Sequence, residues 1–457
     1  MLNASSNRMS LKRRVFDAGA WSLAGVAVSY AIRLGSSLVM TRLLVPQMFG
    51  VMAIAMLVMA ALAMLSDVGL SQNIVQSKRG DDPAFLNTAW TIQILRGLLL
   101  WLLALCIALF VVAANHIGLV PKASVYADFG LPHVIAAVSI SAAIGGFEST
   151  KLSEAARHLA LGRVTRIRIA AQIVGLICMI SWALIDRSIW ALVAGSISAT
   201  AATTLLSHLS LPGISNRWHW DRSAAHEIVH FGKWMFLSSI LGFFANNADR
   251  ILLGGLVDAP TLGIYSIAFT IVNSVVQILN TLFSLVSFPA FSEIARERSV
   301  ELRRGLYRFH TVTASFAYFC SGLLIVSGNS LVTLLYDRRY AQAGWMLEIL
   351  AVGLLTVPFY LGQFSLLARG LPRLFASVIG IRVGVAIVLI PLGFHLYGMP
   401  GALWGIVLGH LSSAPVTIYF QIKYHLFDLP KELLLLPMLL VGMILGSGLN
   451  LAIGHGL

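Results

Sequence analysis

Charged residues are scarce in this sequence. Only 11% of its 457 residues are Asp, Glu, Lys or Arg, whereas 58% are hydrophobic. A soluble globular domain usually carries about 25% charged residues. This deficit excludes a soluble protein and indicates that lipid surrounds most of the chain.

Cysteines, catalytic motifs and long polar segments are also few. The three cysteines, Cys106, Cys178 and Cys320, lie in apolar stretches and offer neither a disulfide framework nor a metal-binding spacing. No phosphate-binding loop of the form GxxxxGK followed by Ser or Thr occurs, which excludes nucleotide hydrolysis by that route. Without paired carboxylates or a sizeable polar loop we expect no enzyme, no cofactor and no metal.

The balance of the few charges is basic. The net charge is +13, which in a soluble protein would suggest a nucleic-acid partner. No soluble basic module with interleaved aromatic residues is present, so we expect no nucleic-acid binding. In a membrane protein, such an excess is typical of cytoplasmic loops.

Apolar segments follow one another along the whole chain. They lie near residues 15–41, 49–71, 89–113, 131–148, 166–186, 188–210, 229–256, 262–288, 311–336, 344–368, 374–397, 399–421 and 432–454. A transmembrane helix needs roughly 20 residues, and barrel strands are much shorter. Because backbone groups in hydrocarbon must bond to one another, we predict an all-α polytopic membrane protein of about 12–13 transmembrane helices.

The positions of Lys and Arg predict the orientation. With a cytoplasmic N-terminus, the outer side receives Arg42, Lys122, Arg187, Arg338 and Arg339. Four arginines fall within helices: Arg33, Arg96, Arg250 and Arg382. All other Lys and Arg residues fall on the cytoplasmic side, as the positive-inside rule requires. We therefore predict a multi-pass protein of the inner (plasma) membrane with a cytoplasmic N-terminus.

The two halves of the chain resemble each other. A shift of 213 positions aligns Gly19 with Gly232, Trp21 with Trp234, Leu43 with Leu256, Gly50 with Gly263, and Ala55 with Ala268. The alternative is coincidence among helices rich in Gly and Leu. A parallel repeat is typical of transporters whose two lobes surround a central cavity.

The repeat predicts four regions. They are an N-terminal six-helix lobe (1–210), a polar cytoplasmic linker (211–228), a C-terminal six-helix lobe (229–425) and an additional C-terminal membrane segment (426–457). The odd last segment, 432–454, either crosses the membrane or lies against it.

Four motifs in this order and spacing resemble a known transporter family. The chain reads RLLVPQMFG at 42–50, SDVGLSQNIVQ at 66–76, NTAWTIQILRG at 87–97 and NNADRILLGGLVDAPTLGIY at 246–265. It is similar, over roughly residues 10–425, to the polysaccharide-transport (Wzx-like O-antigen and exopolysaccharide flippase) family of the multidrug/oligosaccharidyl-lipid/polysaccharide exporter superfamily. Twelve or fourteen helices would be usual there, so the thirteenth segment is a departure.

The resemblance implies a mechanism and a cargo. Two lobes would enclose a cavity that opens alternately to each side, and the cargo would be a polyprenyl-diphosphate-linked oligosaccharide. The protein would also meet membrane lipids, a counter-ion such as H⁺ or Na⁺, and the polymerase and export components of a polysaccharide pathway.

Intramembrane arginines are the first candidates to bind the diphosphate, because a guanidinium matches phosphate oxygens and stays charged. Arg33 shares a helix face with several serines, and Arg250 follows Asn246 and Asn247 by four and three residues. We expect these two arginines on a cavity wall, with snorkelling to the membrane interface as the alternative.

Two further arginines and one carboxylate complete the charged candidates. Arg96 and Arg382 lie closer to the cytoplasmic ends of their helices, where snorkelling is favoured over a cavity position. Asp249 is the best acidic candidate for coupling to an ion or for pairing with an arginine.

The segment 262–288 carries a polar stripe at helical spacing. It consists of Ser266, Thr270, Asn273, Gln277, Asn280 and Ser284. Lipid would not accept this face without cost, so it lines a polar cavity or bonds to another helix. Amides suit sugar hydroxyls, and we select Asn273, Gln277 and Asn280 as candidate binding residues.

Two other functions compete with a flippase. A cation-coupled multidrug exporter of the same superfamily should present carboxylates to its cargo, whereas membrane arginines outnumber convincing carboxylates here. A polysaccharide polymerase or glycosyltransferase would need a catalytic constellation in a large loop, which the sequence does not contain.

Overall fold

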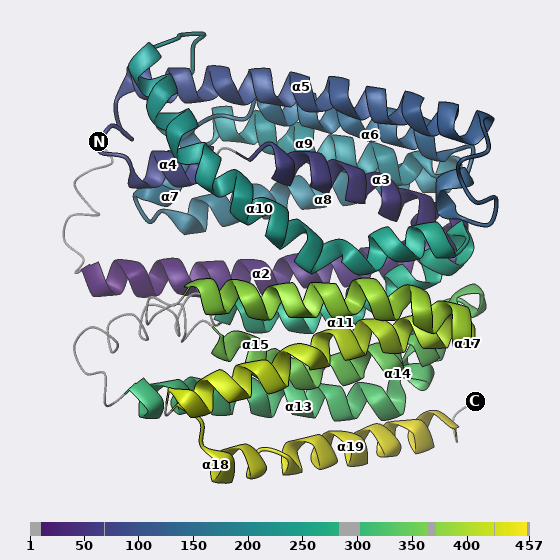
Figure 1. The fold of residues 1–457 in the computed structure, drawn as a ribbon. Coiled ribbons are helices and arrows are strands. Elements are labelled where there is room, and N and C mark those ends of the chain that lie inside the picture. The colour runs from purple at the N-terminus through teal and green to yellow at the C-terminus, as the bar shows by residue number, and fades with distance from the viewer. Residues whose placement is uncertain (1–10, 68, 283–301, 364–371, 425, 455–457) are drawn as a thin grey trace. The chain divides into compact units, whose positions relative to one another are not determined.

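The computed structural model describes residues 11–67, 69–282, 302–363, 372–424 and 426–454. Every regular element in these ranges is a helix, as predicted (Figure 1). Nine helices of the described part are long and apolar enough to cross a membrane, or ten if one bent pair is a single span. The chain divides into two compact units: unit 1 contains residues 1–44, 51–122 and 126–243, and unit 2 the remainder.

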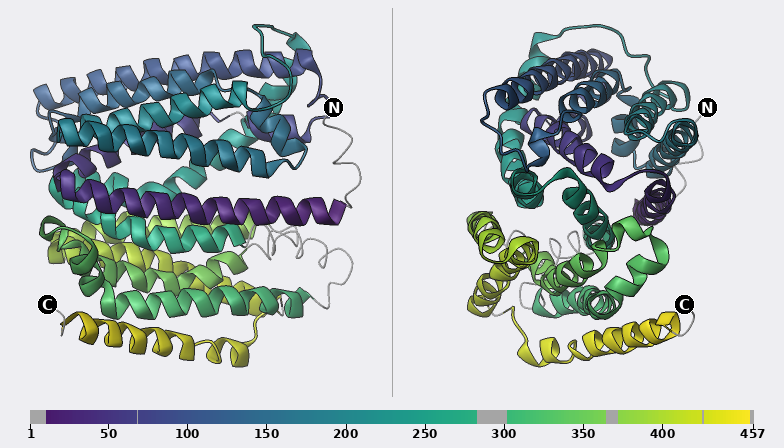
Figure 2. Two further views of the ribbon diagram at one scale, coloured as in Figure 1. Left: turned by 180° about the vertical axis from the view of Figure 1, so that it is seen from behind. Right: turned by 90° about the vertical axis from the view of Figure 1, so that its right-hand side faces the viewer.

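The described part of unit 1 contains the larger part of helix α10 (Arg222–Leu256), up to residue 243, and six other long helices. They are α2 (Leu11–Leu43), α3 (Pro46–Leu65, from residue 51), α5 (Pro83–His116), α6 (Leu131–Gly146), α8 (Leu161–Ile185) and α9 (Trp190–Leu209), with short helices α4 (Leu70–Gln76) and α7 (Lys151–Arg157). Helix α5 packs on α6, α6 on α9, α9 on α8, and α8 on α2 (Figure 2). Helix α5 begins six residues earlier than predicted because Asp82 Oδ1 accepts the Ala84 N–H and Pro83 occupies the first turn.

Unit 2 contains the second set of helices. They are the end of α10 (Arg222–Leu256), α11 (Ala259–Leu282), α13 (Leu302–Leu335), α14 (Ala343–Val352), η5 (Gly353–Thr356), α15 (Val357–Gly362), α17 (Pro372–Lys423), α18 (Leu429–Leu433) and α19 (Pro437–Gly454). Helix α17 has 52 residues, more than twice the length of one span, and Gly398 interrupts it with a φ of 62°. This break separates the two segments predicted at 374–397 and 399–421.

The last segment is packed into unit 2. Helix α19 lies along α13 (Figures 1 and 2). A Cβ at Gly322 would overlap the Leu439 carbonyl, and one at Gly442 the Phe319 carbonyl, so both positions require glycine. Small residues of this kind allow close approach of helices in lipid. Residues Leu429–Ile453, which include α18 and most of α19, form a 25-residue apolar stretch long enough to cross a membrane.

Helix α18 is held on α13 by a buried polar cluster. Glu432 accepts hydrogen bonds from Tyr307 Oη at 2.8 Å and from His310 Nε2 at 3.1 Å. The His310 and Glu432 side chains are only 4% and 10% exposed. Such groups are stable in an apolar environment only while they remain paired.

One pair of repeated glycines occupies a helix crossing. Residues 45–50 belong to unit 2, where the start of α3 meets the start of α11. A Cβ on Gly50 would overlap the Ala259 carbonyl, and one on Gly263 would overlap the Pro46 carbonyl. The two glycines that the 213-residue shift aligns therefore serve the same close contact.

The segment predicted as a linker lies on unit 1. Arg217 N donates to Asn87 Oδ1 at 2.9 Å, and Asp221 N donates to Thr88 Oγ1 at 2.9 Å. Arg79 Nη2 lies 2.8 Å from Asp221 Oδ2, and this bond lowers the pKa of Asp221 to about 2. The division between the compact units falls inside α10, between residues 243 and 244, so the lobe boundaries at 210 and 229 stay a prediction.

Candidate functional site

A cavity of about 160 Å³ lies among the helices of unit 2. Its walls come from α10, α11, the α14–η5 turn and both halves of α17. The lining is largely apolar, with a few polar and charged side chains, which is the usual composition of a ligand site. Six of the predicted site residues lie in this lining: Asn246, Asp249, Asn273, Gln277, Asn280 and Arg382.

Helix α10 places a carboxylate at the cavity. Asp249 accepts a hydrogen bond from the Tyr265 hydroxyl of α11. The hydroxyl is an uncharged donor. Arg250, the next residue, points elsewhere: its guanidinium carbon lies 4.0 Å from the centre of the Phe269 ring, a cation–π contact. Phe269 itself lines the cavity, so Arg250 reaches the site through this ring.

Helix α11 divides its polar stripe between two roles. Three hydroxyls of this helix bond to its own backbone: Ser266 to Leu262, Thr270 to Ser266, and Ser274 to Thr270. The longer amides Asn273, Gln277 and Asn280 line the cavity. Ser284, the last predicted member of the stripe, lies outside the described residues.

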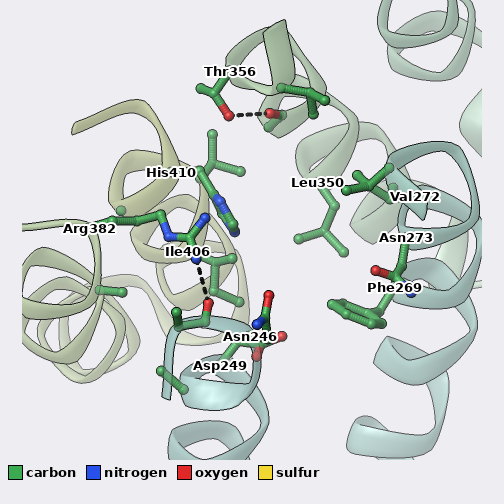
Figure 3. A pocket seen from close by; sticks show the side chains of 18 of the residues that line it. Asn246, Asp249, Phe269, Val272, Asn273, Leu350, Thr356, Arg382, Ile406 and His410 are labelled. Carbon is green, nitrogen blue, oxygen red and sulfur yellow. Dashed lines mark hydrogen bonds between the residues drawn. The ribbon is translucent and has the colours of Figure 1, made fainter. Parts of the chain in front are cut away.

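Helix α17 supplies the positive charge. Arg382 Nη2 donates to the Ala245 carbonyl of α10 at 2.8 Å, which fixes the guanidinium beside the cavity. Figure 3 shows Arg382 and His410 next to each other on the α17 side, across the cavity from Phe269 and Asn273. The two halves of α17, on either side of Gly398, thus place a guanidinium and an imidazole at one wall.

The predicted arginines of unit 1 have other surroundings. Arg96 Nε donates to Ser66 Oγ at 2.9 Å, and its Nη2 donates to the Ala63 carbonyl at 2.6 Å. It therefore binds groups at the C-terminal end of α3, where cations are favoured. Arg33 is exposed on α2. The cavity in unit 2 contains neither residue, and their roles in cargo binding stay predictions.

Three cavity residues were not selected from the sequence. Gln172, an isolated polar residue of a membrane helix, donates to the Ser29 carbonyl of α2 at 3.0 Å. His410 instead lines the cavity, together with Tyr265 and Thr356. His410 lies on α17, far from α10 and α11 in the sequence, so local spacing could not place it at the cavity. An intramembrane histidine is nevertheless itself a sign of function.

The cavity suits an uncharged polar or anionic group more than a metal ion. In the described part of the chain, no three or more His, Cys, Asp and Glu side chains are grouped to hold a metal. Arg382 offers charged donors, the amides offer donors and acceptors, and Phe269 offers an apolar face. This combination can bind a phosphorylated, hydroxyl-rich ligand.

The sequence and the fold of this chain are similar to those of known membrane proteins. It is 23% identical to the lipopolysaccharide biosynthesis protein WzxC of Escherichia coli K12 over 427 residues, 91% of this chain and 82% of the relative. Solved structures share its fold. An inward-facing MATE-family multidrug resistance transporter of the MOP superfamily aligns with a TM-score of 0.65 at 14% identity, covering 89% of this chain and 98% of that one. The lipid II flippase MurJ aligns with a TM-score of 0.61 at 13% identity, covering 97% of each chain.

The fold shared with a MOP-superfamily transporter and with a lipid II flippase confirms the predicted all-α membrane fold class. The family model described as polysaccharide biosynthesis protein matches residues 39–345, more than half of the sequence. The chain therefore belongs to the polysaccharide biosynthesis protein family.

Proposed function

We propose that this protein is a flippase that carries polyprenyl-diphosphate-linked oligosaccharide from the cytoplasmic to the outer leaflet of the inner membrane. Its product would serve exopolysaccharide, O-antigen or capsule synthesis. Family membership supports a role in polysaccharide biosynthesis, and the fold shared with a lipid II flippase supports translocation of a lipid-linked sugar. The observation that carries the proposal is the cavity among apolar helices with Arg382, His410 and a row of amides.

The polar and aromatic groups of this cavity have different roles in carrying the cargo between the leaflets. Arg382 binds a phosphate oxygen of the cargo, since a guanidinium stays charged in a partly dehydrated site. Asn273, Gln277 and Asn280 exchange hydrogen bonds with sugar hydroxyls, which replaces the water lost by the sugar. Phe269, held by Arg250, supports the apolar face of a sugar ring. No bond is made or broken in these steps, so the protein acts as a transporter and not as an enzyme.

Asp249 is the proposed coupling residue. Its carboxylate lies at the cavity and is bonded to Tyr265, so uptake of H⁺ or Na⁺ would change the charge facing the cargo. Alternating access then requires that cargo and ion favour different states, because a ligand shifts an equilibrium only through its differential affinity. The proposed orientation, with a cytoplasmic N-terminus, follows the positive-inside distribution.

Deletion of the gene tests the proposal. We expect loss of surface polysaccharide together with accumulation of polyprenyl-diphosphate glycan in the inner leaflet, and restoration of both by the wild-type gene. Loss of surface polysaccharide without accumulation would instead indicate an earlier biosynthetic step, such as that of a glycosyltransferase. Unchanged glycan in a strain with no second flippase would contradict the proposal.

A multidrug exporter is the second candidate. The Asp249 carboxylate in the cavity and the fold shared with a MATE-family transporter favour it. A drug-sensitivity panel on the deletion strain distinguishes the two functions. Increased sensitivity to several cationic drugs with normal surface polysaccharide would support the exporter.

A further inference from the structure

A second hollow, in unit 1, has the composition of a lipid headgroup site. It has a volume of about 290 Å³ and lies between the start of α8 and the end of α9. Arg163 and Arg166 line it together with apolar side chains that include Ile167, Leu206 and Leu211. Ile167 and Leu211 belong to a buried cluster that also holds Leu152 and Val164, so the floor of the hollow is packed.

The two arginines are available to an anion. Neither forms an ion pair with a carboxylate in the described part of the chain. Arg166 Nε donates to the Gly162 carbonyl of its own helix at 3.2 Å, and its guanidinium carbon lies 6.0 Å from the Trp21 ring centre. These contacts orient the group and leave its other N–H donors without a hydrogen-bond partner among the described residues. Both arginines lie at the N-terminal end of α8, where cations are unfavourable and a bound anion would offset them.

An apolar track continues from the hollow along the same helix face. Ala170, Ile173 and Ile177 follow Arg166 by 4, 7 and 11 residues, and all three are exposed. Leu205 and Leu209 of α9 are also exposed, at 59% and 73%. A charged hollow at a helix end followed by an exposed apolar track matches a ligand with an anionic head and a hydrocarbon tail.

The adjoining segment supports a location at the membrane surface. It follows Leu211 directly and carries Trp218 and Trp220, which are 63% and 52% exposed. The backbone at Arg217, His219 and Asp221 is bonded to α5. Tryptophans concentrate at the headgroup level of a bilayer, where one end of the ring is apolar and the other is hydrated.

We propose that this hollow binds one anionic phospholipid, with its phosphate between Arg163 and Arg166 and an acyl chain along Ala170, Ile173 and Ile177. Basic pockets between transmembrane helices are suited to such headgroups. The site is separate from the cargo cavity, and the inference does not depend on the proposed flippase activity. Its occupant would be a resident lipid of the bilayer.

Native mass spectrometry of the full chain in an uncharged detergent tests this site. Dioleoyl phosphatidylglycerol and dioleoyl phosphatidylcholine are titrated separately. We expect saturable binding of one phosphatidylglycerol, weakened roughly tenfold or more by Arg163→Gln with Arg166→Gln, because each Arg contributes to headgroup attraction. Phosphatidylcholine should bind more weakly and should not respond to these substitutions.

The matched control removes two arginine charges that lie outside the hollow. Arg168 is exposed on the opposite face of α8, and Arg187 is exposed at the other end of this helix pair. Arg168→Gln with Arg187→Gln should leave phosphatidylglycerol binding unchanged. Equal weakening by both double variants, or equal affinity for the two lipids in the wild type, would overturn the proposal. Single Arg163→Gln and Arg166→Gln variants provide the same test if the double variant does not fold.

Discussion

Arg96 in unit 1 and Arg382 in unit 2 make similar bonds in different settings. Each donates a guanidinium N–H to a backbone carbonyl of a neighbouring helix, Arg96 to Ala63 and Arg382 to Ala245. Arg96 does so at the C-terminal end of α3, whereas Arg382 borders a cavity. The same type of bond thus joins two helices in unit 1 and lies beside a cavity in unit 2.

Other polar side chains also either join two helices or line the cavity. In unit 1, Arg79, Asp82 and Asp221 join the segment after α9 to the start of α5. In unit 2, His310 and Glu432 join α13 to α18, yet His410 lies at the cavity. Groups that connect helices should affect stability when changed, and groups that line the cavity should affect transport.

The largest expected effect is a difference in transport between variants of Arg382 and Arg96. Arg382→Gln should reduce transport by about 10- to 100-fold, because a charged hydrogen bond to phosphate contributes roughly 1.5–3 kcal/mol. Arg96→Gln should retain most transport and lower the midpoint of thermal unfolding. Both variants are compared by complementation of surface polysaccharide in the deletion strain, at matched protein amounts.

A further variant tests whether Arg382→Gln reduces transport through the lost guanidinium and not through misfolding. Arg382→Lys retains the charge but not the planar guanidinium, so it should restore part of the transport. If Arg96→Gln and Arg382→Gln lowered transport equally at equal thermal stability, the distinction between the two settings would be wrong.

The next effect concerns the buried pair of unit 2. A buried polar group that loses its hydrogen-bond partner costs roughly 1–3 kcal/mol, so Glu432→Leu, which removes the partner of both Tyr307 and His310, should lower thermal stability. His310→Phe combined with Glu432→Leu should recover part of the loss, because both polar groups are then removed. The measurement is a double-mutant cycle on thermal unfolding in detergent.

A result without recovery would show that the cluster does more than join α13 to α18. Additive losses in the double variant would mean that His310 and Glu432 are not coupled in the folded protein. Transport by the double variant, at a temperature where it is folded, should remain close to that of the wild type.

The smallest effect is expected at the surface of unit 1. Arg79 holds the pKa of Asp221 at about 2, below its ordinary value near 4. The carboxylate therefore contributes stability above pH 4, and this contribution is lost as the pH falls from about 4 to about 2. Attachment of the 211–228 segment should be insensitive to pH between 5 and 8.

Limited trypsin digestion at Arg217 and Arg222 measures this attachment. Asp221→Asn should raise the cleavage rate several-fold at pH 7, and added salt should have a similar effect on the wild type, since exposed ion pairs are screened. A cleavage rate in wild type that changed between pH 6 and pH 8 would indicate that another titrating group controls the segment.

Much of the fold follows from local pattern. Apolar length predicted the helices, and Gly398 falls between two predicted segments at the break of α17. Helix starts depend on local bonds such as that of Asp82, which the apolar pattern does not include. The sequence pattern also indicated Asp249 and the amides of α11, because polar side chains at membrane depth are costly. For Arg382 it favoured snorkelling, whereas this residue lines the cavity.

Local pattern cannot determine which of those polar groups face a cavity. On α11, the short Ser and Thr side chains bond to their own helix, whereas the longer amides extend to the cavity. His410 and Arg382 become neighbours only because α17 folds back after Gly398. The sequence by itself determined where the helices and the intramembrane polar groups are. Tertiary structure decided which of these groups satisfy one another and which remain directed at a ligand, because that depends on contacts between helices distant in sequence.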